Sequence, residues 1–234
     1  MDVVLAGFGL VLLLPFLAIV ALAIRVTDGG GVFYRQIRVG LDRRRFTIIK
    51  FRTMEEGAER ELGAIWAVPD DPRCTKLGSY LRRFGIDELP QLWNVLRGEM
   101  SLVGPRPERP EFTRELRKEH QGYDVRHSVR PGITGYAQIH GWRGLTSIEE
   151  RLRHDMYYVR NWSLWLDAYI LVLTLFRGWS ERPDRALRKE KFQIARFLQL
   201  RFENRNLKSK RVAGTCPSDL RFRFSNLSCR NLAI

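Results

Sequence analysis

Residues 3–24 form an uninterrupted apolar segment, VVLAGFGLVLLLPFLAIVALAI, without a charged side chain. As a helix, at about 1.5 Å per residue, it covers the roughly 30 Å hydrocarbon core of a bilayer. A cleaved signal peptide is disfavoured because Asp2 makes the start acidic and the apolar run is too long. Pro15 lacks an amide hydrogen and predicts a kink near residues 11–14. The residues leave open a kinked single-pass helix and a re-entrant helix.

Two runs rich in β-branched and aromatic residues come next, VFYRQIRVG and RFTIIKFRTM, separated by the polar residues 41–45. This pattern predicts a small β-hairpin. The segment KLGSYLRRFG predicts a short amphipathic helix that ends at Gly85. Residues 86–90, IDELP, open a further helix that runs to Gly98, so Asp87 lies at a helix start.

The following residues combine irregular segments with helices. Residues 99–110 are too rich in proline to be regular, whereas residues 111–120 predict an exposed helix. A helix is also expected over residues 147–165. Trp162, Trp165 and Tyr169 flank an apolar run that is too short to span and suits a membrane interface. The pattern predicts an α+β, mostly helical fold with one small β-hairpin and interfacial amphipathic helices.

The net charge of +14 is concentrated near the C-terminus, where residues 181–234 hold 14 Lys or Arg against 5 Asp or Glu. We therefore divide the chain into a membrane segment (1–27), a central domain (28–180) and a partly disordered basic tail (181–234). A basic tail fits anionic lipid as well as nucleic acid. The cysteines Cys74, Cys216 and Cys229 match no zinc spacing and favour a reducing, cytosol-facing compartment.

The candidate chemistry centres on the adjacent acids Asp87 and Glu88. An Asp N-cap followed by Glu is an ordinary way to begin a helix, and this structural explanation stays open. However, Arg82 and Arg83 precede the acids closely, and Arg106 lies between two prolines in a rigid loop. Fixed guanidinium groups beside carboxylates suit a phosphate substrate with a magnesium ion between the negative charges.

Such a group can carry out displacement at phosphorus. One carboxylate attacks and forms an acyl phosphate, while its neighbour binds Mg²⁺. Lys50, Arg52 and Thr53 end the hairpin, where exposed strand charges are as reasonable as phosphate contacts. The four histidines show no metal spacing, and neither standard phosphate-loop motif is present.

Several long segments resemble, in order, the bacterial sugar transferase family, the monotopic phosphoglycosyl transferases. They are VFYRQIRVG, KFRTM, LRRFGIDELPQLWNVLRGEMSLVGPRP, RHSVRPGITGYAQIHGWRG and DMYYVRNWSLWLD. The resemblance covers residues 28–177, and it favours a catalytic over a capping role for the acid pair.

The resemblance implies roles for individual residues. Asp87 matches the family's nucleophile, and Glu88 the acid that helps to bind Mg²⁺. Arg106, in the PRP motif, is expected near the nucleotide or diphosphate, and Arg82 near phosphate. The remaining substrate-binding candidates lie in the KFRTM and RHSVRPGITG segments: Lys50, Arg52, Arg126 and Arg130.

The implied activity is transfer of a sugar 1-phosphate, expected to be hexose 1-phosphate, from a UDP-sugar to undecaprenyl phosphate with release of UMP. The resemblance also favours a re-entrant helix broken at Pro15 and a catalytic domain on the cytosolic face of the bacterial inner membrane. Larger relatives carry extra membrane helices and a further domain, so the chain is a compact member or part of a longer one. The rival hypotheses are a hydrolase with water as acceptor and a membrane-anchored binder of lipid or nucleic acid without catalysis.

Overall fold

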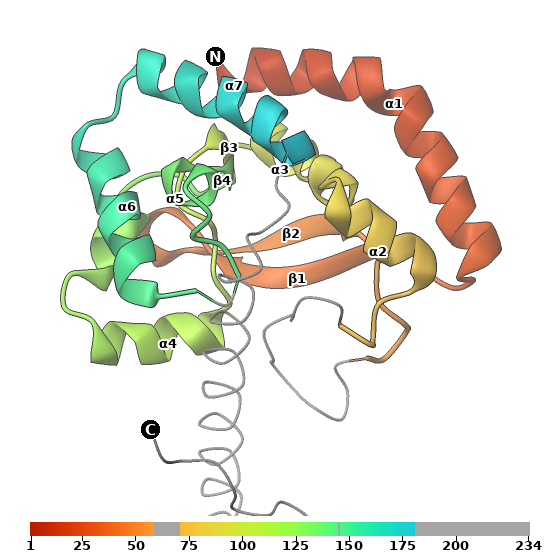
Figure 1. The fold of residues 1–234 in the computed structure, drawn as a ribbon, viewed down its shortest axis with the longest axis horizontal. Helices are drawn as coiled ribbons and strands as arrows, with labels where there is room; N and C mark the ends of the chain where they lie inside the picture. The colour runs from red at the N-terminus through yellow and green to blue at the C-terminus, as the bar shows by residue number, and fades with distance from the viewer. Residues whose placement is uncertain (59–70, 145, 181–234) are drawn as a thin grey trace, which may run out of the picture.

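The computed structural model describes residues 1–58, 71–144 and 146–180. The expected disordered tail at 181–234 lies outside this part of the chain. The described part is mostly helical with a small antiparallel hairpin, which confirms the predicted α+β class. In chain order (Figure 1) the elements are α1 (Asp2–Thr27), β1 (Phe33–Val39), η1 (Leu41–Arg43), β2 (Arg45–Phe51), α2 (Lys76–Arg83), η2 (Ile86–Gln91), α3 (Leu92–Leu96), β3 (Ser101–Val103), α4 (Pro110–Glu119), η3 (Tyr123–His127), β4 (Gly132–Thr134), α5 (Tyr136–Ile139), α6 (Ile148–Arg160) and α7 (Leu164–Ser180).

The predicted hairpin is confirmed by the pairing of β1 with β2, which runs in register from Phe33 opposite Phe51 to Val39 opposite Arg45. The connection contains the 3-10 helix η1, where Asp42 and Arg43 have positive φ angles. On one face of β2, Ile48 is buried in the core, and Lys50, two residues further along the same face, reaches Glu88 of η2.

A second sheet joins β3 and β4 in parallel, and the sequence patterns did not predict it. Residues 99–110 were expected to be irregular, yet β3 forms within them because its partner lies about thirty residues further along the chain. The two backbones approach so closely that a Cβ on Gly132 would overlap the Gly104 nitrogen. Glycine at both positions therefore permits the pairing.

Helix α1 contains Pro15, and Figure 1 shows it as two arms that meet at an angle. Both arms pack on the rest of the protein. Ala6 of the first arm joins a buried cluster with residues of β2 and α3. Residues of the second arm pack on Phe51 and Leu81, and these are Leu17, Val20 and Ile24. Many other apolar side chains of α1 are exposed, among them Val4, Phe8, Val11, Leu12, Ile19, Leu22 and Val26.

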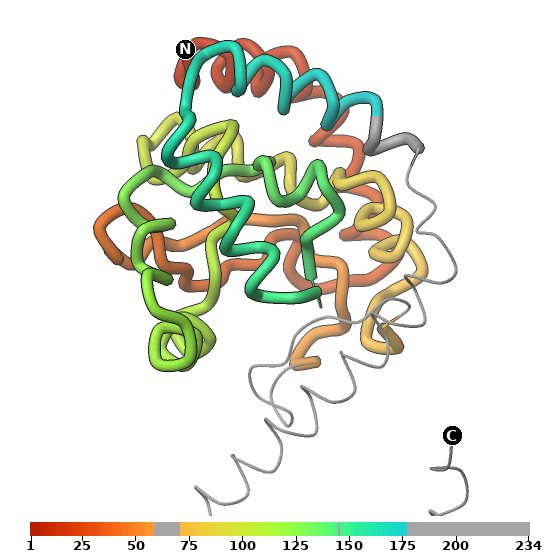
Figure 2. The backbone as a smooth tube through the Cα atoms, turned by 60° about the vertical axis from the view of Figure 1, so that its left-hand side comes forward, coloured from red at the N-terminus to blue at the C-terminus, as the bar shows by residue number. Residues whose placement is uncertain are grey.

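Within the described ranges, α1 is the helix that is long and apolar enough to cross a membrane. The shorter apolar helix α7 lies on the same side of the molecule as the first arm of α1, as Figures 1 and 2 both show.

The single helix expected over residues 147–165 is divided at Asn161, where α6 ends and the chain turns into α7. Trp162, Trp165 and Tyr169 are exposed near this turn.

Candidate active site

The acid pair lies in the 3-10 helix η2, which follows the end of α2. Gly85 adopts a left-handed conformation with φ of 68° and serves as the N-cap, without a side-chain hydrogen bond to the helix. Asp87 is therefore not the cap, and the structural explanation of the acid pair is wrong on this point. Leu89 of the same turn packs against the buried cluster that includes Leu17, Val20 and Ile24 of the second arm of α1, which holds η2 beside this helix.

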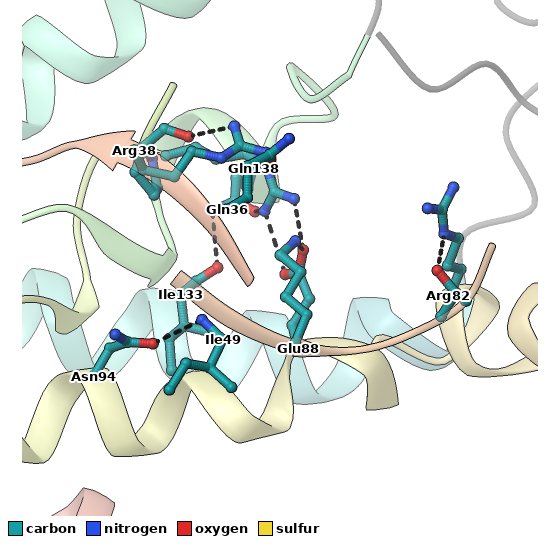
Figure 3. A network of polar contacts seen from close by, with 12 residues as sticks. Gln36, Arg38, Ile49, Arg82, Glu88, Asn94, Ile133 and Gln138 are labelled. Atoms are coloured by element: carbon teal, nitrogen blue, oxygen red, sulfur yellow. Dashed lines mark hydrogen bonds and ion pairs between the residues drawn. The ribbon is translucent and has the colours of Figure 1, made fainter. Parts of the chain in front are cut away.

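Glu88 is held by two cations from distant parts of the chain (Figure 3). Its Oε1 accepts from Lys50 Nζ at 2.6 Å and from Arg106 Nη2 at 2.5 Å. Its Oε2 accepts from Arg106 Nη1 at 3.2 Å, so the guanidinium binds the carboxylate through two nitrogens. Burial opposes ionisation, but the two cations hold the pKa of Glu88 well below its usual range. Glu88 is thus a carboxylate throughout the physiological pH range.

Asp87 has the opposite environment. Its side chain is 7% exposed, and no hydrogen bond or ion pair to it is found within the described part of the chain. Burial and then the neighbouring Glu88 charge raise the pKa of Asp87 to about 6, although Lys50 and Arg82 pull it down. Its oxygens therefore remain available to a substrate, and the higher basicity favours nucleophilic attack.

Arg82 projects from α2 toward the same region. Its Nε donates to Thr53 Oγ1 at 2.7 Å, and its charge lowers the pKa of Asp87. In the described ranges its two terminal nitrogens have no protein partner, and Figure 3 shows the side chain apart from the group around Glu88. The guanidinium is thus fixed at one nitrogen and can still bind an oxyanion, as predicted for phosphate.

Three other predicted substrate-binding residues lie differently. Arg52 is buried and donates to the carbonyls of Asp28 and Gly29, so it holds the chain that leaves α1. Arg126 is 3% exposed and binds protein groups, including the carbonyl of Arg106. Arg130 is exposed, and no described residue bonds to its side chain. These arginines do not join the group around Glu88, and a substrate contact for any of them stays a prediction.

Asn94 was not predicted, yet it joins α3, the helix that directly follows η2, to the strand of Lys50. It is fully buried, its Oδ1 accepts from Ile49 N at 3.1 Å, and its Nδ2 donates to Thr47 O at 2.8 Å. Nδ2 also lies 2.7 Å from Glu99 Oε2. In the sequence, the one indication of this role is that Asn94 interrupts the apolar face of residues 89–96.

Gln138 of α5 is a second residue that sequence reasoning missed. Its Oε1 accepts from Arg106 Nη1 at 3.3 Å, while its Nε2 donates to Ile133 O at 3.1 Å. The amide thus helps to orient the Arg106 guanidinium toward Glu88.

The donor set at η2 is compatible with a magnesium ion. Mg²⁺ is commonly bound by one or two carboxylates together with substrate phosphates, so a cluster of three acidic or histidine ligands is unnecessary. None occurs among the described residues. Asp87 offers carboxylate oxygens that no described group occupies, and Glu88 offers Oε2, whose contact with Arg106 is the longer one.

Comparison with known proteins defines the class to which this fold and site belong. The sequence model of the bacterial sugar transferase family matches residues 1–181. The chain therefore belongs to this family, as its motifs predicted.

Three relatives give the comparison more detail. The chain is 45% identical over 181 residues to the UDP-glucose:undecaprenyl-phosphate glucose-1-phosphate transferase of Escherichia coli (strain K12). It is 44% identical over 181 residues to the Klebsiella pneumoniae protein of the same name. Each alignment covers 76% of this chain and 39% of the relative. The UDP-N-acetylgalactosamine-undecaprenyl-phosphate N-acetylgalactosaminephosphotransferase of Aeromonas hydrophila is 42% identical over 177 residues, which are 75% of this chain and 42% of that protein. The chain thus spans about two fifths of the length of these relatives.

Proposed function

We propose that this chain transfers a sugar 1-phosphate from a UDP-sugar to undecaprenyl phosphate and releases UMP. The observation that carries this proposal is the pair of acids in η2. Asp87 is buried with no partner among the described residues, beside a Glu88 that Lys50 and Arg106 hold ionised. Family membership and relatives named for this reaction support the same conclusion.

In the first half-reaction, an Oδ atom of Asp87 attacks the phosphorus that bears the sugar. The bond from this phosphorus to the oxygen of UMP breaks, and UMP leaves with the bonding electron pair. Arg82 and Arg106 bind non-bridging oxygens, where they balance the charge that shifts during the displacement. The product is a phosphosugar joined to Asp87 as an acyl phosphate.

In the second half-reaction, an oxygen of undecaprenyl phosphate attacks the same phosphorus. The acyl phosphate bond breaks, the Asp87 carboxylate is restored, and the lipid diphosphate sugar is released. Asp87 and Glu88 Oε2 would bind Mg²⁺, which neutralises diphosphate charge when bound. Lys50 keeps Glu88 in place from the strand side throughout both steps.

A membrane position follows from α1. A single-pass helix would carry one arm across the bilayer and away from the catalytic residues. Both arms instead pack on the same body of the protein, through Ala6 in the first and Ile24 in the second. This packing supports a re-entrant α1, with the exposed aromatic residues of α6 and α7 in the headgroup region. The site then faces the cytosol at the bacterial inner membrane, where nucleotide sugar and lipid phosphate meet.

The relatives support a UDP-sugar donor but differ in the sugar. Two are named for glucose and one for N-acetylgalactosamine. We propose a hexose 1-phosphate, and a panel of donors identifies which one. Mg²⁺ belongs to the same proposal and is tested by chelation.

The test is UMP release by the purified, detergent-solubilised protein with Mg²⁺ and a panel of UDP-sugars, with and without undecaprenyl phosphate. Asp87→Asn is compared with Asp42→Asn, a matched control at an exposed position whose positive φ of 50° suits asparagine. We expect the control to equal the wild type and Asp87→Asn to release no UMP.

Three outcomes distinguish the hypotheses. Release that continues through many turnovers only with undecaprenyl phosphate supports a transferase. Equal release without the lipid indicates a hydrolase with water as acceptor. Salt-sensitive binding of nucleic acid or anionic lipid, without release from any donor, indicates the non-catalytic binder.

A further inference from the structure

The loop that carries Arg106, residues 104–108 (GPRPE), has few amide groups of its own that could hold it in place, beyond Gly104 N, which donates to Thr134 O at 2.9 Å. Pro105 and Pro107 have no backbone N–H, and the loop lies between the end of β3 and the start of α4. Its carbonyl groups must therefore find donors elsewhere in the protein. Those donors decide where the Arg106 side chain points.

Four consecutive carbonyls of this loop each accept a hydrogen bond from a distant residue. Pro105 O accepts from Gly132 N at 3.0 Å, and Glu108 O accepts from Val39 N at 3.0 Å. The two carbonyls between them are bound by arginine side chains, of which Arg126 is buried and Arg38 is partly buried. Arg106 O accepts from Arg126 Nη2 at 2.7 Å, and Pro107 O accepts from Arg38 Nη1 at 3.1 Å.

We propose that Arg38 and Arg126 are positioning residues that fix the loop backbone, so that the Arg106 guanidinium meets Glu88 in a set geometry. We call this pair the arginine clamp. Its effect on turnover rests on the proposed function, whereas its effect on the loop does not. Arg126 belongs to the RHSVRPGITG segment that resembles the family, yet its guanidinium contacts protein groups. The clamp gives this residue a role that needs no contact with a substrate.

The contacts of Arg126 suit this role. Its side chain is 3% exposed, its Nη1 donates to Tyr123 Oη at 2.8 Å, and its Nη2 lies 2.9 Å from Asp155 Oδ2. The guanidinium carbon also lies 5.2 Å from the centre of the Tyr123 ring. Because the planar group is held on several sides, its donor to Arg106 O has one direction. A lysine would supply a single flexible donor instead.

Arg38 is oriented in a similar way from the hairpin. Its Nη2 donates to Gln36 Oε1 at 2.5 Å, on the same strand, while Nη1 reaches Pro107 O. Burial and the nearby Arg106 lower the pKa of Arg38, whereas Glu108 raises it. A partly buried cation beside another cation is costly, so the interactions that Arg38 makes in this position must offset that cost.

The first experiment measures the loop without any need for turnover. Hydrogen exchange of the backbone amides of Val39 and Gly132, which donate to this loop, is followed in Arg38→Lys and Arg126→Lys. Arg52→Lys is the matched control, since Arg52 is 9% exposed and donates to the backbone carbonyls of Asp28 and Gly29 rather than to the loop, at the end of the hairpin opposite Val39. We expect about tenfold faster exchange in the clamp variants and unchanged exchange in the control. Unchanged exchange in the clamp variants, or an equal rise in the control, would overturn the proposal.

The second experiment is a double-mutant cycle on UMP release. If Arg126 acts through Arg106, Arg126→Lys lowers turnover strongly in the wild type but little in the Arg106→Lys background. An equal fold loss in both backgrounds contradicts the clamp and indicates a general structural effect. If the wild-type protein releases no UMP, the proposed function fails and the exchange measurement alone decides whether the clamp exists.

Discussion

Asp87 and Glu88 are neighbours in one turn, yet the protein shifts their acidities in opposite directions. Glu88 meets two cations at 2.5 to 2.6 Å, which outweigh the cost of its burial. Asp87 is buried without such partners, so burial dominates and its pKa rises to about 6. Two adjacent carboxylates can therefore have different roles, one as a fixed anion and the other as a reactive group.

The raised pKa of Asp87 makes a prediction about stability. Its pKa in the folded protein, about 6, exceeds the ordinary value of 3.8, so folding favours the protonated form. Above pH 6 the ionised Asp87 carboxylate therefore lowers the free energy of unfolding by its full amount. This loss of stability decreases as the pH falls from 6 toward 3.8. Asp87→Asn should be inactive yet more stable than the wild type at pH 8, by on the order of 1–3 kcal/mol. The difference should become smaller at pH 4.5.

Chemical denaturation of both proteins in detergent with a chelator, at pH 8 and pH 4.5, measures this difference. The chelator is required because a bound cation would stabilise the wild-type carboxylate. A variant that is less stable than the wild type at pH 8 would mean that Asp87 has a stabilising partner in the folded protein.

Among the elements, β2 and α3 pack together through Ile48, Leu92 and Val95, and the Asn94 side chain adds hydrogen bonds between them. Asn94 bonds to both Thr47 and Ile49 and thereby sets the position of Lys50 against Glu88. Asn94→Ala leaves a buried amide and a buried carbonyl without partners, so we expect a loss of about 2–4 kcal/mol in unfolding free energy and a large loss of UMP release. Asn161→Ala, which removes an exposed hydrogen bond to Tyr157 O, is the control and should cost less than about 1 kcal/mol. Equal losses in the two variants would show that the link is unimportant.

The close approach of β3 and β4 gives a second prediction for the elements. Gly132→Ala places a Cβ against the backbone of Gly104 and Thr134, where no flexible side chain can move aside. We expect the sheet to separate, the Arg106 loop to shift, and both thermal stability and UMP release to fall. Gly31→Ala is the matched control, because nothing lies within 4 Å of the position that a Cβ would take there. Wild-type behaviour of Gly132→Ala in thermal denaturation would refute this explanation of the glycine.

For the whole molecule, the packing of both arms of α1 predicts that residue 2 and the catalytic domain lie on the same side of the membrane. We replace the native cysteines with serine and introduce one cysteine, either Asp2→Cys or Arg43→Cys at an exposed loop. An impermeant maleimide should label neither variant in intact spheroplasts and both in opened membranes. Labelling of Asp2→Cys in intact spheroplasts would establish a spanning helix.

Local patterns predicted much of this fold, because the hairpin, α2 and the apolar α1 depend mainly on residues close in sequence. The pairing of β3 with β4 was missed because three residues carry no periodicity and their partner is distant. Three residues that the motifs singled out, Glu88, Lys50 and Arg106, do lie in contact, while their catalytic and binding roles stay predictions. The motifs do not indicate that Arg52 holds the end of α1 or that Arg126 binds a backbone carbonyl, because those contacts join segments far apart in sequence.

The claim that Asp87 forms a covalent bond to the phosphosugar is tested most directly by trapping that species. The protein is incubated with a UDP-sugar labelled on the phosphorus next to the sugar, without lipid acceptor, then quenched and digested. If Asp87 is the nucleophile, we expect label on the peptide that contains Asp87 and no label in Asp87→Asn. Hydroxylamine or undecaprenyl phosphate should release this label from the peptide. An enzyme that releases UMP only when the lipid is present and never carries label would contradict it, because the transfer would then be a single displacement.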